Sequence, residues 1–274
     1  MVRPAVRRRA VEAARTDHGL TERRACALMG MDRSSFRYRS RRPDDGELRS
    51  RLRWLAGQRP RYGARRLYVL LRREGRLVNH KRIERLYRLE GLAVRRRRRK
   101  RVAAVSREAR PLPTGVNERW SMDFTHDATA EGRAFRTLNI VDDWSRECIA
   151  IDVARSIPGE RVAAVLGRLA RQRGLPKAIV VDNGPEFVSQ ALDAWAYRAG
   201  VQLQFIEPGK PVQNAFVESF NGSFRDECLN QHWFETIEDA MARIEAWRLD
   251  YNRFRPHSSL GDLTPEEFAA RRAA

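Results

Sequence analysis

The first hundred residues place apolar side chains at helical spacing, in two pairs of short helices. Residues 20–39 predict a helix capped by Thr21 and a second, shorter helix from Asp32. Residues 63–91 predict another pair, whose second helix is capped by Asn79. The inward positions expected for this second pair are Leu67, Leu70, Leu71, Ile83, Leu86 and Leu89. Each pair has the outline of a helix-turn-helix, although a plain helical hairpin has the same pattern.

From residue 119 the pattern changes to short apolar runs. Strands are predicted at 119–125, 135–141 and 147–153, and their short links favour antiparallel hairpins. Helices and strands then alternate, with a helix at 159–173, a strand at 178–181, a helix at 189–199, a strand at 201–206 and a helix at 213–227. This order predicts an α/β fold, a mixed sheet flanked by helices and preceded by a helical region.

The charge divides the chain into two halves of opposite sign. The 274 residues carry 54 Lys and Arg against 35 Asp and Glu, a net charge of +19. Residues 1–110 hold 35 basic and 11 acidic side chains, a net of +24, whereas residues 111–274 hold 19 and 24, a net of −5. A strongly basic half favours binding of a nucleic acid through its phosphates. The alternative is a solvated arginine-rich surface.

These patterns predict four segments: a helix-turn-helix-like segment at 1–42, a second helix-turn-helix-like DNA-binding domain at 43–94, a basic linker at 95–113 and a core with a C-terminal helical extension at 114–274. The basic side chains of the second domain and the linker are predicted to contact DNA. They include Arg65, Arg66, Lys81, Arg82, Arg95, Arg96, Arg97, Arg98, Arg99, Lys100 and Arg101. A solvated tether is the alternative for the linker.

Cysteine usage and hydropathy indicate in which cellular compartment the protein is expected. The three cysteines are far apart in the sequence, so neither a disulfide framework nor a thiolate zinc site is expected, and a reducing compartment is favoured. Charged residues interrupt every apolar run before it reaches the roughly 18 residues of a membrane span. We therefore expect a cytoplasmic protein without a membrane partner.

Acidic residues of the second half occupy positions that a core does not need. Asp123 lies in the first predicted strand, and Asp182 ends an apolar strand just before a Gly-Pro turn. Glu218 lies in the last predicted helix, and Arg225 follows it by seven residues, which is two helical turns. Their face of the helix also carries Asn214 and Asn221, which we expect to contact DNA. On another face, Phe216, Phe220 and Phe224 are expected to pack against the sheet, where Phe220→Ala would cost about 3 to 5 kcal/mol.

Carboxylates brought together repel one another, and divalent cations remove this cost. Oxygen-only ligands favour Mg²⁺ or Mn²⁺, and a pair of such ions about 3.5 to 4 Å apart supports in-line displacement at a phosphate. The interpretation is therefore a two-ion site on Asp123, Asp182 and Glu218. Asn183 and Glu186 lie next to Asp182 and are expected to support it, with Glu186 also a candidate for positioning DNA.

Several motifs resemble those of bacterial insertion-sequence transposases, specifically the protein of the second open reading frame. Asp182 and Glu218 are separated by 35 residues and Arg225 follows, which is similar to the Asp-Asp-Glu (DDE) signature of the retroviral integrase superfamily. The similar words in the core are 120–125 (WSMDFT), 182–187 (DNGPEF), 214–222 (NAFVESFNG), 251–252 (YN) and 255–261 (RPHSSLG). Those of the internal helix-turn-helix are 61–67 (RYGARRL) and 78–82 (VNHKR).

The resemblance implies a ribonuclease H-like core in which Asp123, Asp182 and Glu218 are both catalytic residues and metal ligands, with Arg225 against substrate DNA. It implies two steps at one site: water frees a 3′-hydroxyl at an element end, and this hydroxyl attacks a second phosphodiester. The implied partners are double-stranded DNA of element ends and target, further copies of the chain on DNA, and an upstream open reading frame product, in some cases joined by frameshifting. The DNA-bound protein would lie at the bacterial nucleoid. Two alternatives remain open, a catalytically inactive DNA-binding regulator and a ribonuclease H-like nuclease that does not join strands.

Overall fold

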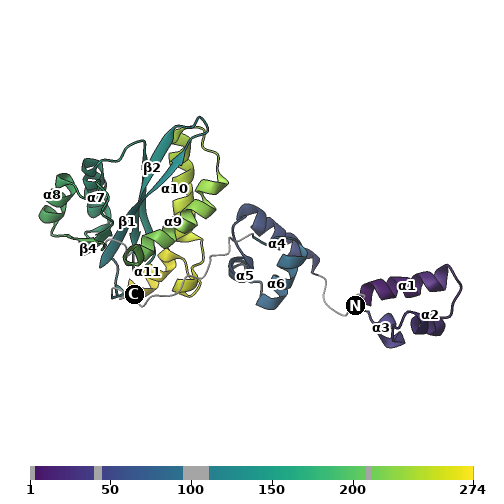
Figure 1. Cartoon of the computed structure of the whole chain (residues 1–274). Helices are drawn as coiled ribbons and strands as arrows, with labels where there is room; N and C mark the ends of the chain where they lie inside the picture. Colours follow the sequence, from purple (N-terminus) through teal and green to yellow (C-terminus); the bar gives the residue numbers. More distant parts are fainter. Residues whose placement is uncertain (1–3, 40–44, 95–110, 208–210, 274) are drawn as a thin grey trace. The chain divides into compact units, whose positions relative to one another are not determined.

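The computed structural model describes residues 4–39, 45–94, 111–207 and 211–273 (Figure 1). The chain divides into two compact units, Met1–Leu48 and Arg49–Ala274. Residues 95–110, which hold the predicted basic run from Arg95 to Arg101, lie outside the described residues. Within the described part, no helix combines the length and the hydropathy that a membrane crossing requires.

The first unit contains three helices, α1 (Pro4–Thr16), α2 (Glu22–Leu28) and α3 (Arg33–Arg37). The Thr21 hydroxyl accepts a hydrogen bond from the Arg24 N–H at 3.4 Å, which satisfies one of the free donors at the start of α2. The helices share a small apolar core of Val11, Ala14, Ala25, Cys26, Met31 and Phe36. The predicted pair α2 and α3 is confirmed, whereas the sequence analysis missed α1.

A second set of helices follows: α4 (Gly46–Gln58), α5 (Ala64–Arg73) and α6 (His80–Leu89). Asn79 caps α6, as predicted. The buried inward residues are Leu67, Leu71, Ile83 and Leu86. The expectation was wrong for Leu89, the last residue of α6, which is 65% exposed among the described residues because the helix ends there. The sequence pattern did not predict α4.

Five strands form one mixed sheet, in the order β3-β2-β1-β4-β5. They are β1 (Arg119–Ala128), β2 (Ala134–Asp142), β3 (Cys148–Ala154), β4 (Ala178–Val181) and β5 (Gln202–Phe205). β1, β2 and β3 are antiparallel neighbours, and β4 and β5 run parallel to β1. The two hairpins and the mixed α/β sheet are thus confirmed, and the arrangement is the ribonuclease H-like fold.

Helices cover both faces of the sheet (Figure 1). The helical elements of the core are α7 (Gly159–Arg173), α8 (Gln190–Ala199), η1 (Pro211–Asn214), α9 (Ala215–Glu227), η2 (Leu229–Gln231), α10 (Ile237–Arg253), η3 (Ser258–Leu260) and α11 (Pro265–Ala273). Side chains alternate along each strand. Accordingly, Trp120, Met122 and Leu138 pack with α7 and α8, whereas Phe135 and Val141 pack with α9 and α10.

The three phenylalanines of α9 do not all lie in the core. Phe220 and Phe224 are 2% and 0% exposed, as expected for residues packed on the sheet. Phe216 is only partly buried, and the Cζ atom of Arg146 lies 3.8 Å from its ring centroid. The prediction was wrong for Phe216, because the first turn of α9 meets an arginine of the β2–β3 turn instead of an apolar surface.

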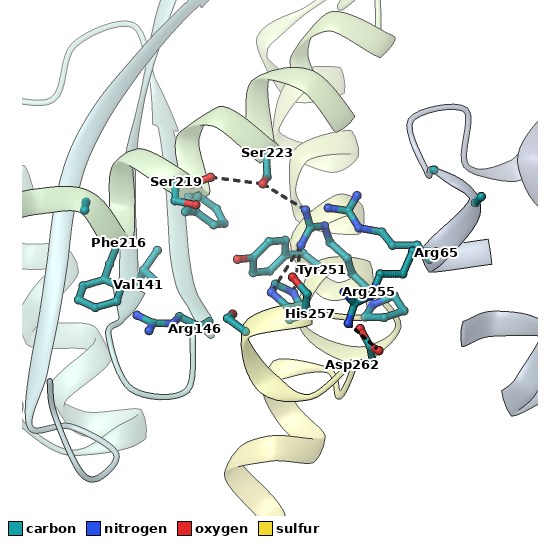
Figure 2. Close-up of a pocket in the computed structure, with 18 residues that line it drawn as sticks. Arg65, Val141, Arg146, Phe216, Ser219, Ser223, Tyr251, Arg255, His257 and Asp262 are labelled. Carbon is teal, nitrogen blue, oxygen red and sulfur yellow. Dashed lines mark hydrogen bonds and ion pairs between the residues drawn. The ribbon is translucent and has the colours of Figure 1, made fainter. Parts of the chain in front are cut away.

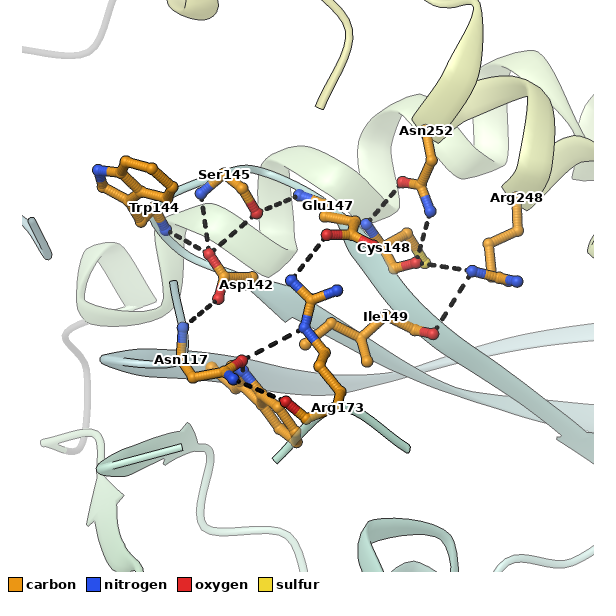
Figure 3. Close-up of polar contacts among 11 residues, drawn as sticks. Asn117, Asp142, Trp144, Ser145, Glu147, Cys148, Ile149, Arg173, Arg248 and Asn252 are labelled. Atoms are coloured by element: carbon orange, nitrogen blue, oxygen red, sulfur yellow. Dashed lines mark hydrogen bonds and ion pairs between the residues drawn. The ribbon is translucent and has the colours of Figure 1, made fainter. Parts of the chain in front are cut away.

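Polar side chains fix the β2–β3 turn and the edge strand (Figure 3). One oxygen of Asp142 accepts hydrogen bonds from the N–H groups of Trp144 (3.0 Å) and Ser145 (2.8 Å), which closes the hairpin as predicted. The Asn252 amide of α10 bonds both the N–H and the C=O of Cys148, each at 2.9 Å. These bonds occupy polar groups that an edge strand otherwise leaves free, and they dock α10 on β3.

Candidate active site

Asp123 lies in β1, and Asp182 directly follows the neighbouring strand β4. β1 and β4 are parallel and pair in the register Arg119 with Ala178 through Ser121 with Val180. Continued by two residues, this register would place Asp182, the residue that follows β4, opposite Asp123, at about one strand spacing of 4.8 Å. Equivalent register positions point to the same face, so both carboxylates emerge on the face that α9 covers.

Glu218 reaches this face from α9 and contributes to its electrostatics. The pKa of the Asp123 carboxyl is raised to about 6, mainly by burial and also by the negative charges of Asp182 and Glu218. Hydrogen bonds from the Phe124 N–H and the Asn221 amide oppose this shift. The three predicted carboxylates therefore lie within electrostatic reach of one another.

A buried amide relay orients Asp123. The Asn221 Nδ2 of α9 donates to Asp123 Oδ2 at 2.7 Å, and the Asn139 Nδ2 of β2 donates to Asn221 Oδ1 at 2.7 Å. Asn139 is fully buried and also donates to Thr125 Oγ1 at 2.9 Å. Asn221 was predicted to contact DNA, but its amide is engaged with Asp123. Asn139 was not predicted as a site residue. The available signal was a single amide within an apolar predicted strand, and in the sheet this residue pairs with Asp123.

The turn after β4 holds Asp182 in a fixed position. The Gly184 N–H donates to Asp182 Oδ1 at 2.9 Å, and a Cβ at Gly184 would lie only 2.9 Å from the same oxygen. The Asn183 Nδ2 donates to the Ile206 carbonyl at 3.0 Å and so ties this turn to the chain beyond β5. Asn183 therefore supports the turn that carries Asp182.

Glu186, in the turn after β4, forms an ion pair with Arg136 of β2. Its carboxylate accepts a hydrogen bond from the Arg136 guanidinium, which holds the pKa of Glu186 below its usual range. The Arg136 Cζ also lies 4.3 Å from the Phe124 ring centroid, and that ring stacks on Phe187 at 4.9 Å. This contact joins β2 to the turn after Asp182. Arg136 was missed by the sequence analysis.

The remaining predicted residues of α9 differ in exposure. Arg225 is exposed, and its Nη2 donates to the His126 carbonyl at 3.0 Å. Asn214 is 3% exposed, and its Nδ2 donates to the Met122 carbonyl at 3.2 Å, so its burial argues against the predicted DNA contact. Arg225 thus remains available to a ligand and Asn214 does not.

The three carboxylates form no ion pair with a basic side chain of the described residues. In the described part of the chain, none of them has a Lys, Arg or His nitrogen within 4.0 Å. The donor set consists of carboxylate oxygens, which fits Mg²⁺ or Mn²⁺. Among the described residues, no three His, Cys, Asp or Glu side chains are gathered closely enough to hold an ion as they stand. The set fits such a metal by its chemistry and its unbalanced charge.

The arginines predicted at the second pair of helices contact acidic side chains of the core. Arg66 Nη1 lies 2.7 Å from Glu227 Oε1, and Arg65 Nη2 lies 3.2 Å from Asp262 Oδ2. Lys81 is exposed and Arg82 is partly buried. The predicted DNA contacts of these side chains stay predictions, and Arg66 in particular has a structural partner.

A second polar cluster surrounds the far end of α9, where a cavity of about 660 Å³ lies (Figure 2). Arg255 donates through Nε and Nη2 to the two oxygens of Glu227 at 2.7 and 2.8 Å. Its Nη1 lies 3.3 Å from His257 Nε2, and its Nη2 donates to Ser223 Oγ at 3.1 Å. Arg255 and His257, from the word 255–261 noted in the sequence, therefore belong to a largely buried polar cluster with Glu227.

Comparison with known proteins shows to which broad class of proteins the chain is similar. An integrase core domain model matches residues 113–211, a second integrase core domain model matches 199–265, and an HTH-like domain model matches 47–100. A simian T-cell lymphotropic virus intasome structure superposes with a TM-score of 0.51 at 15% identity, covering 80% of this chain and 74% of that chain. These matches define an integrase-core protein with an HTH-like domain.

Relatives at the sequence level are more specific. An uncharacterized 31.7 kDa protein of insertion element IS407 from Burkholderia multivorans is 52% identical over 265 residues, 96% of each chain. Transposase InsF of insertion sequence IS3A from Escherichia coli is 30% identical over 223 residues, 76% of each chain. The chain belongs to the insertion-sequence transposases of the second-open-reading-frame type, which carry an integrase core.

Proposed function

We propose that the chain is a DDE transposase that cleaves DNA at the ends of its element and joins those ends to target DNA. The observation that carries the proposal is that Asp182 and Glu218 lie near enough to Asp123 to raise its pKa, while none of the three has a cationic side chain within 4.0 Å in the described residues, in a chain that belongs to the insertion-sequence transposases. Uncompensated carboxylates in a chain whose first 110 residues carry a net charge of +24 favour metal-dependent chemistry on a nucleic acid.

The side chains divide the work in this proposal. Asp123, Asp182 and Glu218 would hold Mg²⁺ or Mn²⁺, most simply two ions. When bound, the pair supplies activation of the attacking hydroxyl and stabilisation of the leaving oxygen. Asn221 keeps the Asp123 carboxylate oriented through its 2.7 Å hydrogen bond. Arg225 would neutralise a phosphate of the substrate strand, since its guanidinium is exposed and bonded only to the His126 carbonyl in the described residues.

The proposal extends to partners. Double-stranded DNA of the element ends and of the target is the substrate, and the HTH-like match at 47–100 supports a separate DNA-binding domain near the predicted range 43–94. Further copies of the chain on DNA and an upstream open reading frame product complete the assembly that we propose. Such a complex would act at the bacterial nucleoid.

Strand joining on labelled DNA tests the proposal. The full chain, alone and fused to the upstream product, is incubated with labelled duplexes bearing the terminal sequences of its element, with Mg²⁺, with Mn²⁺ or with a chelator. The variants are Asp123→Ala, Asp182→Ala and Glu218→Ala. Asp193→Asn is the matched control, because Asp193 is an exposed carboxylate on α8.

Joined products that require metal and disappear in all three variants, but not in Asp193→Asn, are the expected result. Shortened strands without joining would instead support the ribonuclease H-like nuclease. Retarded DNA with neither product would support the inactive regulator. Joining that survives Asp123→Ala would contradict the assignment of the site.

A further inference from the structure

A pocket of about 300 Å³ is lined by Arg225 of α9 and by the end of β1. Its walls are residues 127–130 at the end of β1, Arg225, and residues 229–234 after α9. The Ala130 N–H donates to the Phe234 carbonyl at 2.7 Å, and the Phe234 side chain is 2% exposed. A backbone hydrogen bond and a buried ring thus hold the two walls together.

Two elements lead from the carboxylates to this pocket. Along β1, four residues separate Asp123 from Asp127, which is about 13 Å of strand. Along α9, seven residues separate Glu218 from Arg225, which is about 10 Å of helix. Since successive nucleotides of a duplex strand are spaced about 3.4 Å along the axis, the pocket lies about three to four nucleotides from the carboxylates.

The lining suits a nucleobase better than a phosphate. Trp233 is 77% exposed, and an indole face is a platform on which bases stack. Asp127 and Arg225 bring opposite charges to the pocket, so a phosphate would gain one attraction and meet one repulsion. Within the described residues, the side chains of Asn230 and Trp233 form no hydrogen bond, which leaves an amide and an indole N–H for the edge of a base.

We propose that this pocket binds an unpaired base of the DNA strand, three or four nucleotides from the phosphodiester that the carboxylates address, with the base stacked on Trp233. This inference rests on the proposed function. Arg225 lines the pocket and is held by its 3.0 Å bond to the His126 carbonyl, where it would meet the backbone of the same strand. A DNA end that frays near the cleavage point would be stabilised in its open form.

Binding measurements on the full chain test the pocket. Three labelled DNA probes are compared at one salt concentration: a blunt duplex, the same duplex with a short single-stranded extension, and one whose extension is abasic. The proteins are wild type, Trp233→Ala, Trp233→Phe and Tyr197→Ala. Tyr197 is the matched control, since it is an aromatic residue of α8 that is 90% exposed.

Wild type should bind the base-bearing extension about 5- to 100-fold more tightly than the blunt duplex. Trp233→Ala should reduce this preference to the level of the abasic probe, Trp233→Phe should retain most of it, and Tyr197→Ala should leave it unchanged. A fluorescent base in the extension should be quenched by wild type and not by Trp233→Ala. Thermal unfolding of Trp233→Ala should match wild type, because the side chain is exposed.

Three outcomes would contradict base binding in this pocket. They are equal wild-type affinity for the blunt and extended duplexes, equal affinity for the abasic and base-bearing extensions, and an equal loss of affinity for all three probes in Trp233→Ala. The strand-joining assay separates this from the proposed function. If the chain joins strands but shows no preference for the base-bearing extension, only the proposed base-binding role of the pocket is contradicted. If it shows that preference but does not join strands, only the proposed function is contradicted. A wild-type chain that binds none of the probes contradicts both.

Discussion

Carboxylates at the two ends of α9 differ in whether a cationic side chain lies beside them. Near its start, Glu218 faces Asp123 and Asp182 with no cation within 4.0 Å in the described residues. At its end, Glu227 is almost buried and accepts two hydrogen bonds from Arg255, with Arg66 also 2.7 Å away. A chain with 54 basic residues places arginines where a carboxylate must be buried, and leaves the other cluster uncompensated.

The pKa shifts follow this difference. Burial pushes the pKa of the Glu227 carboxyl upward, but the guanidinium groups of Arg255 and Arg66 outweigh it and lower the pKa below its usual range. For Asp123, burial and the neighbouring carboxylates together raise the pKa to about 6. The same functional group on the same helix-covered face is thus stabilised as an anion at one end and destabilised at the other.

The largest effect is expected at Phe220, which lies between the two ends. Its ring is 2% exposed and contacts the rings of Phe224, Trp247 and Tyr251 at 5.0 to 6.0 Å between centroids. Phe220→Ala should lower the free energy of unfolding by about 3 to 5 kcal/mol in urea titrations. Phe254→Ala is the control, because Phe254 is 57% exposed. A loss below 1 kcal/mol at Phe220 would show that α9 does not depend on this face.

Glu227→Gln tests the paired end. The change leaves the buried guanidinium of Arg255 without its counter-charge, although the amide keeps part of the hydrogen bonding, so we expect a loss of about 3 kcal/mol. Glu266→Gln is the matched control, since its ion pair with Arg253 is more than half exposed and should contribute less than about 1 kcal/mol. Equal losses in the two variants would remove the distinction between the ends of α9.

Asp123→Asn tests the unpaired end and should act in the opposite direction. Removing a half-buried carboxylate that faces two others should raise the free energy of unfolding at pH 7 by about 1 to 3 kcal/mol in the presence of a chelator. Asp193→Asn, on exposed α8, should change it by less than about 0.5 kcal/mol. Added Mg²⁺ should raise the melting temperature of wild type more than that of Asp123→Asn. Destabilisation by Asp123→Asn would argue that the cluster is a structural one.

Much of the core was predictable because its periodicities are strong. The hairpin links at 131–133 and 142–146, the helix at 159–173 and the strand at 178–181 follow from alternation and helical spacing alone. The helices α1 and α4 were missed because their apolar positions are few among arginines. Phe216 and Leu89 were misplaced because a sequence period shows which residues share a face, but not where the covering surface ends.

The candidate site was predictable in part. Asp123, Asp182 and Glu218 were found from strand ends and a family signature, and their adjacency follows from the register of β1 and β4. The partners Asn139 and Arg136 come from β2, and only the pairing of strands reveals that they meet residues far away in the sequence. Long-range polar contacts of this kind leave no local period, so sequence patterns do not report them.

The smallest expected effect concerns the pH dependence of the paired end. Burial and the charges of Arg255 and Arg66 lower the pKa of His257 to about 2, whereas an unfolded histidine titrates near 6.5. Above pH 6.5 both states are neutral and stability is complete; below it, only the unfolded state binds the proton. Each pH unit below 6.5 should therefore cost wild type about 1 kcal/mol that His257→Asn does not lose. Urea titrations between pH 7.5 and 5 measure this difference, and other groups, including Asp123, cancel because both proteins share them. Parallel profiles for the two proteins would mean that His257 takes up its proton in the folded state, and the cluster around Glu227 would then not exclude a further positive charge.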